Sequence, residues 1–534
     1  MSIAPTVTEA GAASTAPPLR SPGRWWTLGI VSIATFMLML DLTVVNVALP
    51  DLRTALHADF SALQWVLDAY ALTLAAFLLT GGSLADRLGR KRVYGVGFVV
   101  FTAASLACGA APDILALNLA RGVQGAGAAV LFAVGPALIG QEFRGKDRAL
   151  AFGVFGGVSG LAIAFGPLIG GALTDGIGWR WIFLVNVPIG LVAMVLGALR
   201  IGESRDPAAH RVDWGGLVVF SAALTLLVLG FLRGEAEGWT SAPILGMFGG
   251  GVLLLALFVL IERRLGAAAM LDLGLFRNLT FNGISVATLL ANAAGMSAIF
   301  LEVSYMQNVL GYSPLATGLR FLPLTLTLFV AAAVTGSLTA SVPPRLLVGS
   351  AITLMSAGLF LVTLVKPGSN WLALLPAMLL TGLGMGMFNP PRSALAIGVA
   401  EPAKAGMAAG IGETFQQVGI AIGIAGFGAL FQHRVAGSFA HSAAGAALGP
   451  QADAAGQAVA AGAGRTLAAS APESLRAALQ AAAREAFVHG LTDVLIGCGA
   501  VAALGAVAGF LFIRGRDLHE SALAGAELGG HPGH

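Results

Sequence analysis

The sequence predicts an all-α integral membrane protein. Of its 534 residues, 57% are hydrophobic and only 11% are charged, whereas a soluble globular protein carries roughly 25% charged residues because its surface faces water. A disordered chain is excluded, because disorder requires low hydrophobicity and high charge. The two cysteines, Cys108 and Cys498, lie inside apolar runs and exclude a disulfide scaffold. The chain is therefore expected to be dissolved in a lipid bilayer.

Apolar segments of membrane-spanning length recur along the whole chain. A spanning helix needs about 20 mainly apolar residues, and about fourteen segments meet this criterion. The first 25 residues are polar and lack the apolar core of a cleavable signal, so we expect the first span to be retained. The expected transmembrane helices are 26–50, 62–84, 93–112, 114–138, 149–172, 181–200, 214–232, 243–261, 280–309, 315–338, 345–365, 371–390, 405–431 and 487–513.

The charge of the connecting loops predicts the orientation. An even number of spans places both termini on one side, and about 20 of the 30 Lys and Arg residues fall there. We therefore expect both tails, 1–25 and 514–534, to be cytoplasmic. This topology explains the net charge of +3 better than a nucleic-acid partner does. The eight histidines are scattered, so the sequence predicts no metal site.

One connection is long. Residues 432–486 are rich in Ala and Gly and are expected to form an outer loop between the last two spans. Within and beyond this loop, residues 472–489 carry an apolar stripe of Leu475, Leu479 and Phe487. The stripe favours a short amphipathic helix, and the composition equally fits a flexible spacer.

Charged residues inside the spans are the first functional candidates, since a charge at membrane depth costs about 2.5–3.5 kcal/mol. At 1.5 Å per residue, Asp41 lies roughly 13 Å below the outer end of its span, and three others lie at roughly 9–11 Å. Glu413 lies roughly 12 Å from the inner surface. Surplus acid at one depth is expected to hold a proton or attract a cation. The alternative is a structural ion pair, such as Asp41 with Arg121. The five candidates are Asp41, Asp68, Arg121, Glu302 and Glu413.

A basic loop follows the second span and reads Gly82-Ser-Leu-Ala-Asp86-Arg87-Leu-Gly89-Arg90-Lys91-Arg92. Its simplest interpretation is the positive-inside charge bias. Asp86 interrupts the basic run, Gly82 allows close helix approach, and Gly89 allows a tight turn. We expect Asp86 to face a helix N-terminus or an arginine in a contact that breaks and re-forms. The expected gating residues are Gly82, Asp86, Arg87, Gly89 and Arg90.

This loop resembles the signature loop of the major facilitator superfamily. Four further stretches resemble the fourteen-span drug:proton antiporter branch of that family, and all lie in order in spans one to six. They read Leu40-Asp41-Leu-Thr43-Val-Val-Asn46-Val-Ala-Leu-Pro50, Arg121-Gly122-Val-Gln124-Gly125-Ala-Gly127, Gly166-Pro167-Leu-Ile-Gly170-Gly171, and Trp179-Arg180-Trp181-Ile-Phe183 followed by Asn186-Val-Pro188-Ile-Gly190. The span count and the long last outer loop extend the resemblance to nearly the whole chain.

The resemblance implies two six-helix bundles, 26–201 and 278–513, separated by an inserted helix pair at 214–263. It also implies proton-coupled efflux of lipophilic, cationic drugs or antibiotics across the cytoplasmic membrane by alternating access, with the proton gradient as energy source and no cofactor. Arg121 matches the family's fourth-helix arginine, linked to proton transfer, and Asp41 matches its first-helix acid.

The fifth-span motif of Gly166, Pro167, Gly170 and Gly171 matches the segment associated with antiporters in the family. Pro167 removes a backbone donor, and the glycines let helices pack closely or bend there. Ordinary close packing is the alternative for each glycine. Ala162 stands where the family motif usually begins with glycine. The second-half counterpart of the signature loop, residues 336–345, has lost its acid, so the inner gate is expected to rest on the first-half loop.

Other functions remain open from the sequence. Uptake or exchange of a nutrient, lipid or peptide is one alternative, and a non-transporting membrane sensor is another. The sequence has no phosphate loop, nucleophile elbow or His-Glu-x-x-His motif, so we expect no enzyme. A small molecule, protons and lipids are the expected partners of a monomer, and an anionic or neutral substrate stays open. The cavity candidates, for which packing or lipid contact is the alternative, are Phe300, Tyr305, Met306 and Met385.

Overall fold

The computed structural model describes residues 23–58, 60–143, 145–204, 213–266, 271–339, 341–401 and 405–517, and these residues form helices and turns without a β-strand. Thirteen of their helices are long and apolar enough to cross a membrane. The expected fifth span corresponds to α5 (Gly145–Ile177), which contains two shorter apolar stretches. The all-helical membrane fold is confirmed, and the count of fourteen spans stays a prediction.

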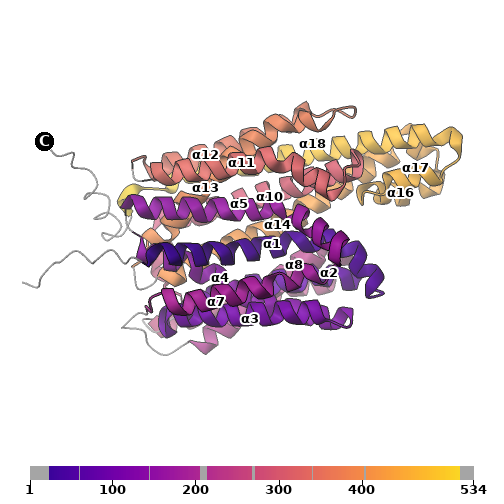
Figure 1. Ribbon diagram of the computed structural model, residues 1–534. Helices are drawn as coiled ribbons and strands as arrows, with labels where there is room; N and C mark the ends of the chain where they lie inside the picture. The colour runs from indigo at the N-terminus through magenta and orange to yellow at the C-terminus, as the bar shows by residue number, and fades with distance from the viewer. Residues whose placement is uncertain are drawn as a thin grey trace, which may run out of the picture.

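The first half of the chain forms one bundle. The α2 and α3 helices pack on α4, α1 packs on α5, and α3 packs on α7. The sixth expected span is broken at Val185, just before Pro188, into a short helix and a longer one. Figure 1 shows these helices together in indigo and purple. The elements are α1 (Arg24–Ala55), α2 (Phe60–Leu88), α3 (Arg90–Ala110), α4 (Ile114–Glu142), α5, α6 (Trp181–Leu184) and α7 (Asn186–Arg200).

The second half forms its own core. A large apolar cluster joins the helices of this half, and Leu301, Met355 and Leu495 are among its buried members. Figure 1 shows these helices, coloured from salmon pink through orange to yellow, beside the first bundle. They are α10 (Leu279–Ser304), which continues as the π-helix η3 (Tyr305–Val309), α11 (Pro314–Leu338), α12 (Pro344–Phe360), α13 (Leu375–Gly398), α14 (Ala405–Ala440) and α18 (Glu473–Phe512).

An additional helix pair, α8 (Trp214–Glu237) and α9 (Ala242–Leu265), lies between the two halves in sequence. The α8 helix packs on α9, on α2 and on α14. The Ser221 hydroxyl of α8 donates to the Ala76 carbonyl of α2 at 3.0 Å and lies 3.4 Å from the Thr80 hydroxyl. The α8 helix also contributes Phe220, whose ring lies 5.0 Å from that of Phe258 of α9, to an apolar cluster that includes residues of α2, α9 and α14. The pair therefore contacts both halves of the molecule.

The long outer connection is largely helical. The α14 helix continues to Ala440, α18 begins at Glu473, and α15 (Ala443–Ala446), α16 (Ala452–Ala460) and α17 (Gly464–Ser470) lie between them. Alanine-rich sequence favours helix strongly, which explains why a spacer-like composition is ordered. The amphipathic-helix interpretation of 472–489 is thus confirmed, and this helix is continuous with the last span. Figure 1 shows α16 and α17 beside the first part of α18 at one end of the molecule.

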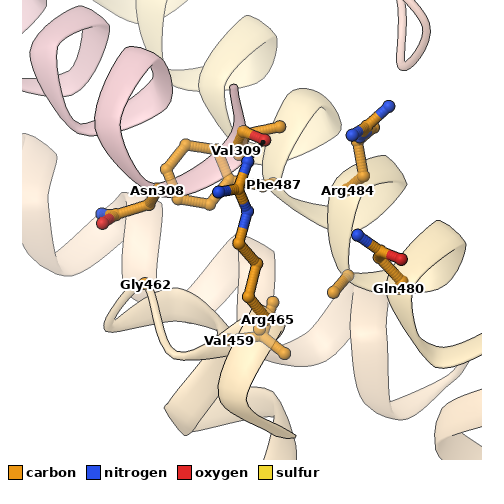
Figure 2. Close-up of a pocket in the computed structure, with 10 residues that line it drawn as sticks. Asn308, Val309, Val459, Gly462, Arg465, Gln480, Arg484 and Phe487 are labelled. Carbon is orange, nitrogen blue, oxygen red and sulfur yellow. Dashed lines mark hydrogen bonds between the residues drawn. The ribbon is translucent and has the colours of Figure 1, made fainter. Parts of the chain in front are cut away.

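These outer helices dock on the end of α10. Arg465 of α17 donates a hydrogen bond to the Val309 carbonyl at 2.9 Å, where the π-helix ends. Figure 2 shows the Arg465 guanidinium beside Val309, with Phe487 and Asn308 around it. The pocket there has a volume of about 30 Å³, far below the roughly 300–1,000 Å³ of a drug-sized site. It therefore serves as a docking contact within the second half.

We call the end that holds the start of α1 and the end of α18 the inner end. Here the two halves meet through α5 with α11 and through α2 and α4 with α14. A Cβ added at Gly153 would lie 3.0 Å from the Ala332 carbonyl oxygen, and one added at Gly410 would lie 3.0 Å from that of Leu78. The interhelical contacts at Gly153 and Gly410 thus lie toward the inner end, as expected of an arrangement that is closed on that side.

Candidate transport site

Asp41 and Arg121 form a buried ion pair between α1 and α4. The Asp41 Oδ2 and Arg121 Nη1 atoms lie 2.5 Å apart, and each residue is 1% exposed. The Gln124 amide donates to Asp41 Oδ1 at 3.0 Å, and the Asn186 amide donates to it from α7 at 3.4 Å. The Asp41 carboxylate therefore receives donors from two other helices, which is how a buried charge is made tolerable.

Arg121 is held by groups other than the carboxylate as well. Its Nε donates to the Val66 carbonyl of α2 at 3.0 Å, and its Nη1 donates to Gln124 Oε1 at 2.7 Å. Its guanidinium carbon lies 4.2 Å from the centre of the Tyr70 ring, in a cation–π contact. The ion pair that the sequence left as an alternative is thus present, and it joins α1, α2, α4 and α7.

The α1 and α5 helices cross just beyond Asp41. A Cβ added at Gly166 would overlap the Thr43 side chain, and one added at Gly170 would lie 3.1 Å from Val44 Cγ2. Gly171 faces open space. The Pro167 side chain lies outside the described residues. Two glycines of the fifth-span motif therefore fix a helix contact within one turn of the buried carboxylate.

Asp68 stands apart from this network. It is half-buried on α2, and the opposite charge that acts on it is Arg233 of α8. Arg233 also lies 5.6 Å from the Trp65 ring and pairs with Glu237 at 2.7 Å. The structure therefore places Asp68 beside the inserted pair and not beside Arg121.

Glu302 lies in the core of the second half. It is 1% exposed on α10, one turn before the π-helix, and its Oε1 atom has no hydrogen-bond partner. Cys498 of α18 lies within its electrostatic range. Among the described residues no cation pairs with Glu302 within 4.0 Å. It is therefore a buried acid that carries no structural ion pair in this conformation.

Glu413 has a partner that the sequence analysis missed. Arg392 Nη2 of α13 donates to Glu413 Oε1 of α14 at 3.1 Å, and both side chains are 5% exposed. Arg392 follows Pro390 and Pro391, just past the expected end of that span at residue 390. A span boundary drawn one turn later would have exposed it as a further buried charge.

The five predicted residues thus occupy separate places, and only Asp41 and Arg121 contact each other.

Asp86 bridges the two halves near the inner end. Its Oδ1 accepts from Arg90 Nε at 3.0 Å and Nη2 at 2.8 Å, and its Oδ2 accepts the Met407 backbone N–H at 2.8 Å. Met407 lies in the first turn of α14, where unpaired N–H groups and the helix dipole favour an anion. The prediction that Asp86 faces a helix N-terminus or an arginine is borne out by this geometry, since it faces both.

The turn behind Asp86 is fixed from the first half. Gly89 has φ +109°, a conformation that residues with a side chain rarely adopt, and a Cβ there would lie 2.7 Å from Glu203 Oε1. Arg90 also donates to Gln141 Oε1 at 3.0 Å. Arg87 lies within electrostatic range of Glu262, and Gly82 is buried within α2. These contacts tie the turn behind Asp86 to the first half and to α9.

The cavity candidates behave as packing residues. Tyr305 and Met306 are fully buried in the second-half core, and Met385 belongs to the same cluster. Phe300 is 52% exposed on the apolar outside of the bundle. Their alternative interpretation as packing or lipid-facing residues is favoured for this conformation.

Comparison with known proteins identifies the family. The family model described as the Major Facilitator Superfamily matches residues 31–424. The chain belongs to the Major Facilitator Superfamily. As a member it is a multi-pass membrane transporter and not an enzyme. The "Puromycin resistance protein pur8" of Streptomyces alboniger is 36% identical over 410 residues, which is 76% of this chain and 81% of that protein.

Two further similarities agree with the family. The "Multidrug resistance protein Stp" of Mycobacterium tuberculosis is 33% identical over 406 residues, covering 76% of this chain and 75% of that protein. The crystal structure of the human organic anion transporter MFSD10 superposes with a TM-score of 0.60 at 12% identity, covering 91% of this chain and 100% of that one. The structural match supports the major facilitator fold alone.

The buried acids of this major facilitator protein predict opposite stability effects. Glu413→Gln leaves the Arg392 guanidinium buried without a carboxylate, and breaking a buried pair costs about 3–5 kcal/mol. Glu302→Gln removes a carboxyl group that has no charged partner to lose. We expect the melting temperature of the purified protein to fall clearly for Glu413→Gln and to stay unchanged or rise for Glu302→Gln. Equal shifts in the two variants would contradict this assignment.

Proposed function

We propose that this transporter exports a lipophilic, cationic drug or antibiotic across the cytoplasmic membrane in exchange for protons. The names of its relatives refer to puromycin and multidrug resistance, which supports a small-molecule drug as substrate. The positive-inside charge distribution supports cytoplasmic termini. The proposed rocking units are residues 26–201 and 278–513, with the pair 214–263 attached between them, and the proposed active form is a monomer.

The observation that carries the proposal is the buried Asp41–Arg121 pair, 2.5 Å apart between α1 and α4. A proton on Asp41 cancels the negative charge that Arg121 faces, and an unpaired buried cation is costly. Protonation therefore favours a rearrangement of α1 against α4. A cationic substrate and a proton compete for the Asp41 carboxylate. The two therefore bind in turn, which couples export of one to entry of the other.

The inner-closed arrangement fits the outward-facing step of the proposed cycle. With the inner end closed by Asp86 and Met407, Asp41 is expected to exchange protons with the outside, along with Asp68 and Glu302 in supporting positions. Proton entry from outside displaces the substrate, and the return to the inward-facing state delivers the proton to the cytoplasm. Glu413, which is paired with Arg392 near the inner end, is proposed to act on that inward-facing state.

Reconstitution in inverted vesicles tests the proposal. When the lumen is acidic, protons leave the vesicle through the antiporter. Their exit drives a permanently charged quaternary ammonium dye into the lumen, so we expect the dye to accumulate there. A permanently charged dye is required because weak bases accumulate in acidic vesicles without a protein. Protein-free vesicles and collapse of the gradient with a protonophore are the controls.

The alternative functions give different signs in the same assay. A proton-coupled uptake transporter empties the acidic lumen of its substrate, and a sensor binds ligand without flux. Parallel assays with neutral and anionic compounds report the substrate class. Accumulation of anions in preference to cations would overturn the proposed charge of the substrate while leaving export itself intact.

A further inference from the structure

A groove of about 480 Å³ lies between α3 and α7 near the inner end of the first half. It is separate from the Asp41 network and is lined by residues of both helices and of the turn after α7. The lining includes Lys91, Arg92, Gly95, Phe98, Gly197 and Glu203. Its position, its shape and its charge each restrict what can occupy it.

The groove opens on the lipid-facing surface. Large apolar side chains beside it are strongly exposed, with Val96 at 59%, Val195 at 55% and Leu199 at 73%. In a membrane-spanning protein such a surface contacts acyl chains, so lipid is the solvent that fills the groove. A Cβ added at Gly95 would have no atom within 4 Å, which leaves an open channel along α3 between the larger side chains. The open space and the mostly apolar lining of this channel suit a hydrocarbon chain.

The inner rim of the groove is positively charged. Lys91 and Arg92 provide two cations and Glu203 provides one carboxylate. The Glu203 carboxylate is already engaged by the backbone N–H groups of Lys91 at 3.1 Å and Ser204 at 3.0 Å, and it lies 3.5 Å from Arg92 Nε. Within the described residues no acidic side chain pairs with the Lys91 ammonium. The rim therefore offers a net positive charge at the level of lipid headgroups.

We propose that an anionic phospholipid binds in this groove, with its phosphate at Lys91 and Arg92 and one acyl chain along Gly95 and Phe98. Basic rims between transmembrane helices are suited to anionic headgroups. The excess of positive charge selects an anionic headgroup over a zwitterionic one, because the latter brings its own cation to the rim. A soluble anion lacks the chain that fills the apolar part, and a drug cation is repelled by the rim.

The proposed lipid headgroup lies beside the turn at Gly89, which carries the Asp86–Arg90 contact. Glu203 contacts Gly89, and Ser204 accepts the Arg90 backbone N–H at 2.8 Å. Arg90 in turn holds Asp86. A headgroup that competes with Glu203 for Arg92 therefore acts on the same turn that positions the gate.

Native mass spectrometry of the full chain in detergent tests the site, with equimolar dioleoyl phosphatidylglycerol and dioleoyl phosphatidylcholine as probes. We expect the wild type to retain phosphatidylglycerol preferentially. The Lys91→Gln/Arg92→Gln variant is expected to lose this preference by about thirtyfold, since each basic residue at the surface contributes about one factor of five. The matched control is Arg263→Gln/Arg264→Gln, an exposed basic pair in the last turn of α9 that does not line this groove.

A second variant tests the acyl-chain part independently. Gly95→Leu keeps both cations and fills the channel, where space for a side chain exists, so it is expected to fold and to lose phosphatidylglycerol retention. Equal retention by the Lys91/Arg92 variant and the Arg263/Arg264 control would overturn the proposal, as would unchanged retention in Gly95→Leu. Either result would mean that the lipid contacts here belong to a general annulus.

Discussion

Asp41→Asn is expected to abolish export driven by a pH gradient. Asparagine keeps the shape of the side chain but cannot take up a proton or carry the charge that pairs with Arg121 at 2.5 Å. Arg121 keeps the Val66 carbonyl, Gln124 and Tyr70, so the folded state survives with a loss of about 3–5 kcal/mol, the usual cost of breaking a buried pair. Arg121→Ala is expected to give the same functional loss because it strands the carboxylate.

The measurement is accumulation of a quaternary ammonium dye in inverted vesicles with an acidic lumen, alongside dye exchange without a gradient. Asp41→Asn is expected to lose the first and to retain part of the second. Asp493→Asn is the matched control, because Asp493 pairs with Arg434 at 3.7 Å and both side chains are more than half exposed. Gradient-driven accumulation at the wild-type rate in Asp41→Asn would refute the coupling role of this residue.

Asp86→Asn is expected to open the inner end of the molecule. The carboxylate holds both Arg90 and the first turn of α14, and hydrogen bonds to charged groups contribute about 1.5–3 kcal/mol each. Losing one such contribution shifts the equilibrium between inner-closed and inner-open states by about tenfold or more. The lost Met407 contact lies between the halves, whereas the weakened Arg90 contact lies within the first half.

Cysteine labelling reads out this opening. Ala409 is 4% exposed and packs against the core of the first half, so a cysteine placed there becomes accessible when the inner end opens. We expect a membrane-impermeant maleimide added from the inner side to label Ala409→Cys faster in the Asp86→Asn background. Asp147→Asn is the control, since Asp147 pairs with Arg24 at 2.8 Å within the first half. Equal labelling rates in the two backgrounds would exclude Asp86 as the gate.

Much of the fold was predictable because length and hydropathy alone decide which segments cross a bilayer. The Asp86 contact was predictable too, since an acid within a basic run needs a donor-rich partner. The helical outer connection was only one of two alternatives, because its short side chains carry a weak apolar pattern. The burial of Leu479 and Phe487 in the second-half core stabilises the helical alternative.

The candidate site was predicted only in part, because the sequence does not show toward which neighbour each side chain points around its helix axis. Depth along a helix follows from counting residues, but the direction in which a side chain points does not follow when the helix is apolar on both faces. Asp68 and Arg121 share a depth, yet Asp68 faces Arg233 of α8. The Gln124 and Asn186 amides, quoted in the motifs without a role, supply the hydrogen bonds that complete the Asp41 network.

The α8 helix contacts the two halves of the molecule by different kinds of interaction. The Ser221 hydroxyl of α8 bonds to α2, whereas α8 meets α14 in an apolar cluster, shared with Leu79 of α2, without a hydrogen bond from that hydroxyl. Hydrogen bonds resist shear, while apolar surfaces slide over one another at little cost as long as they stay covered. We therefore expect α8 and α9 to move together with the first bundle, while α14 slides along the apolar surface of α8.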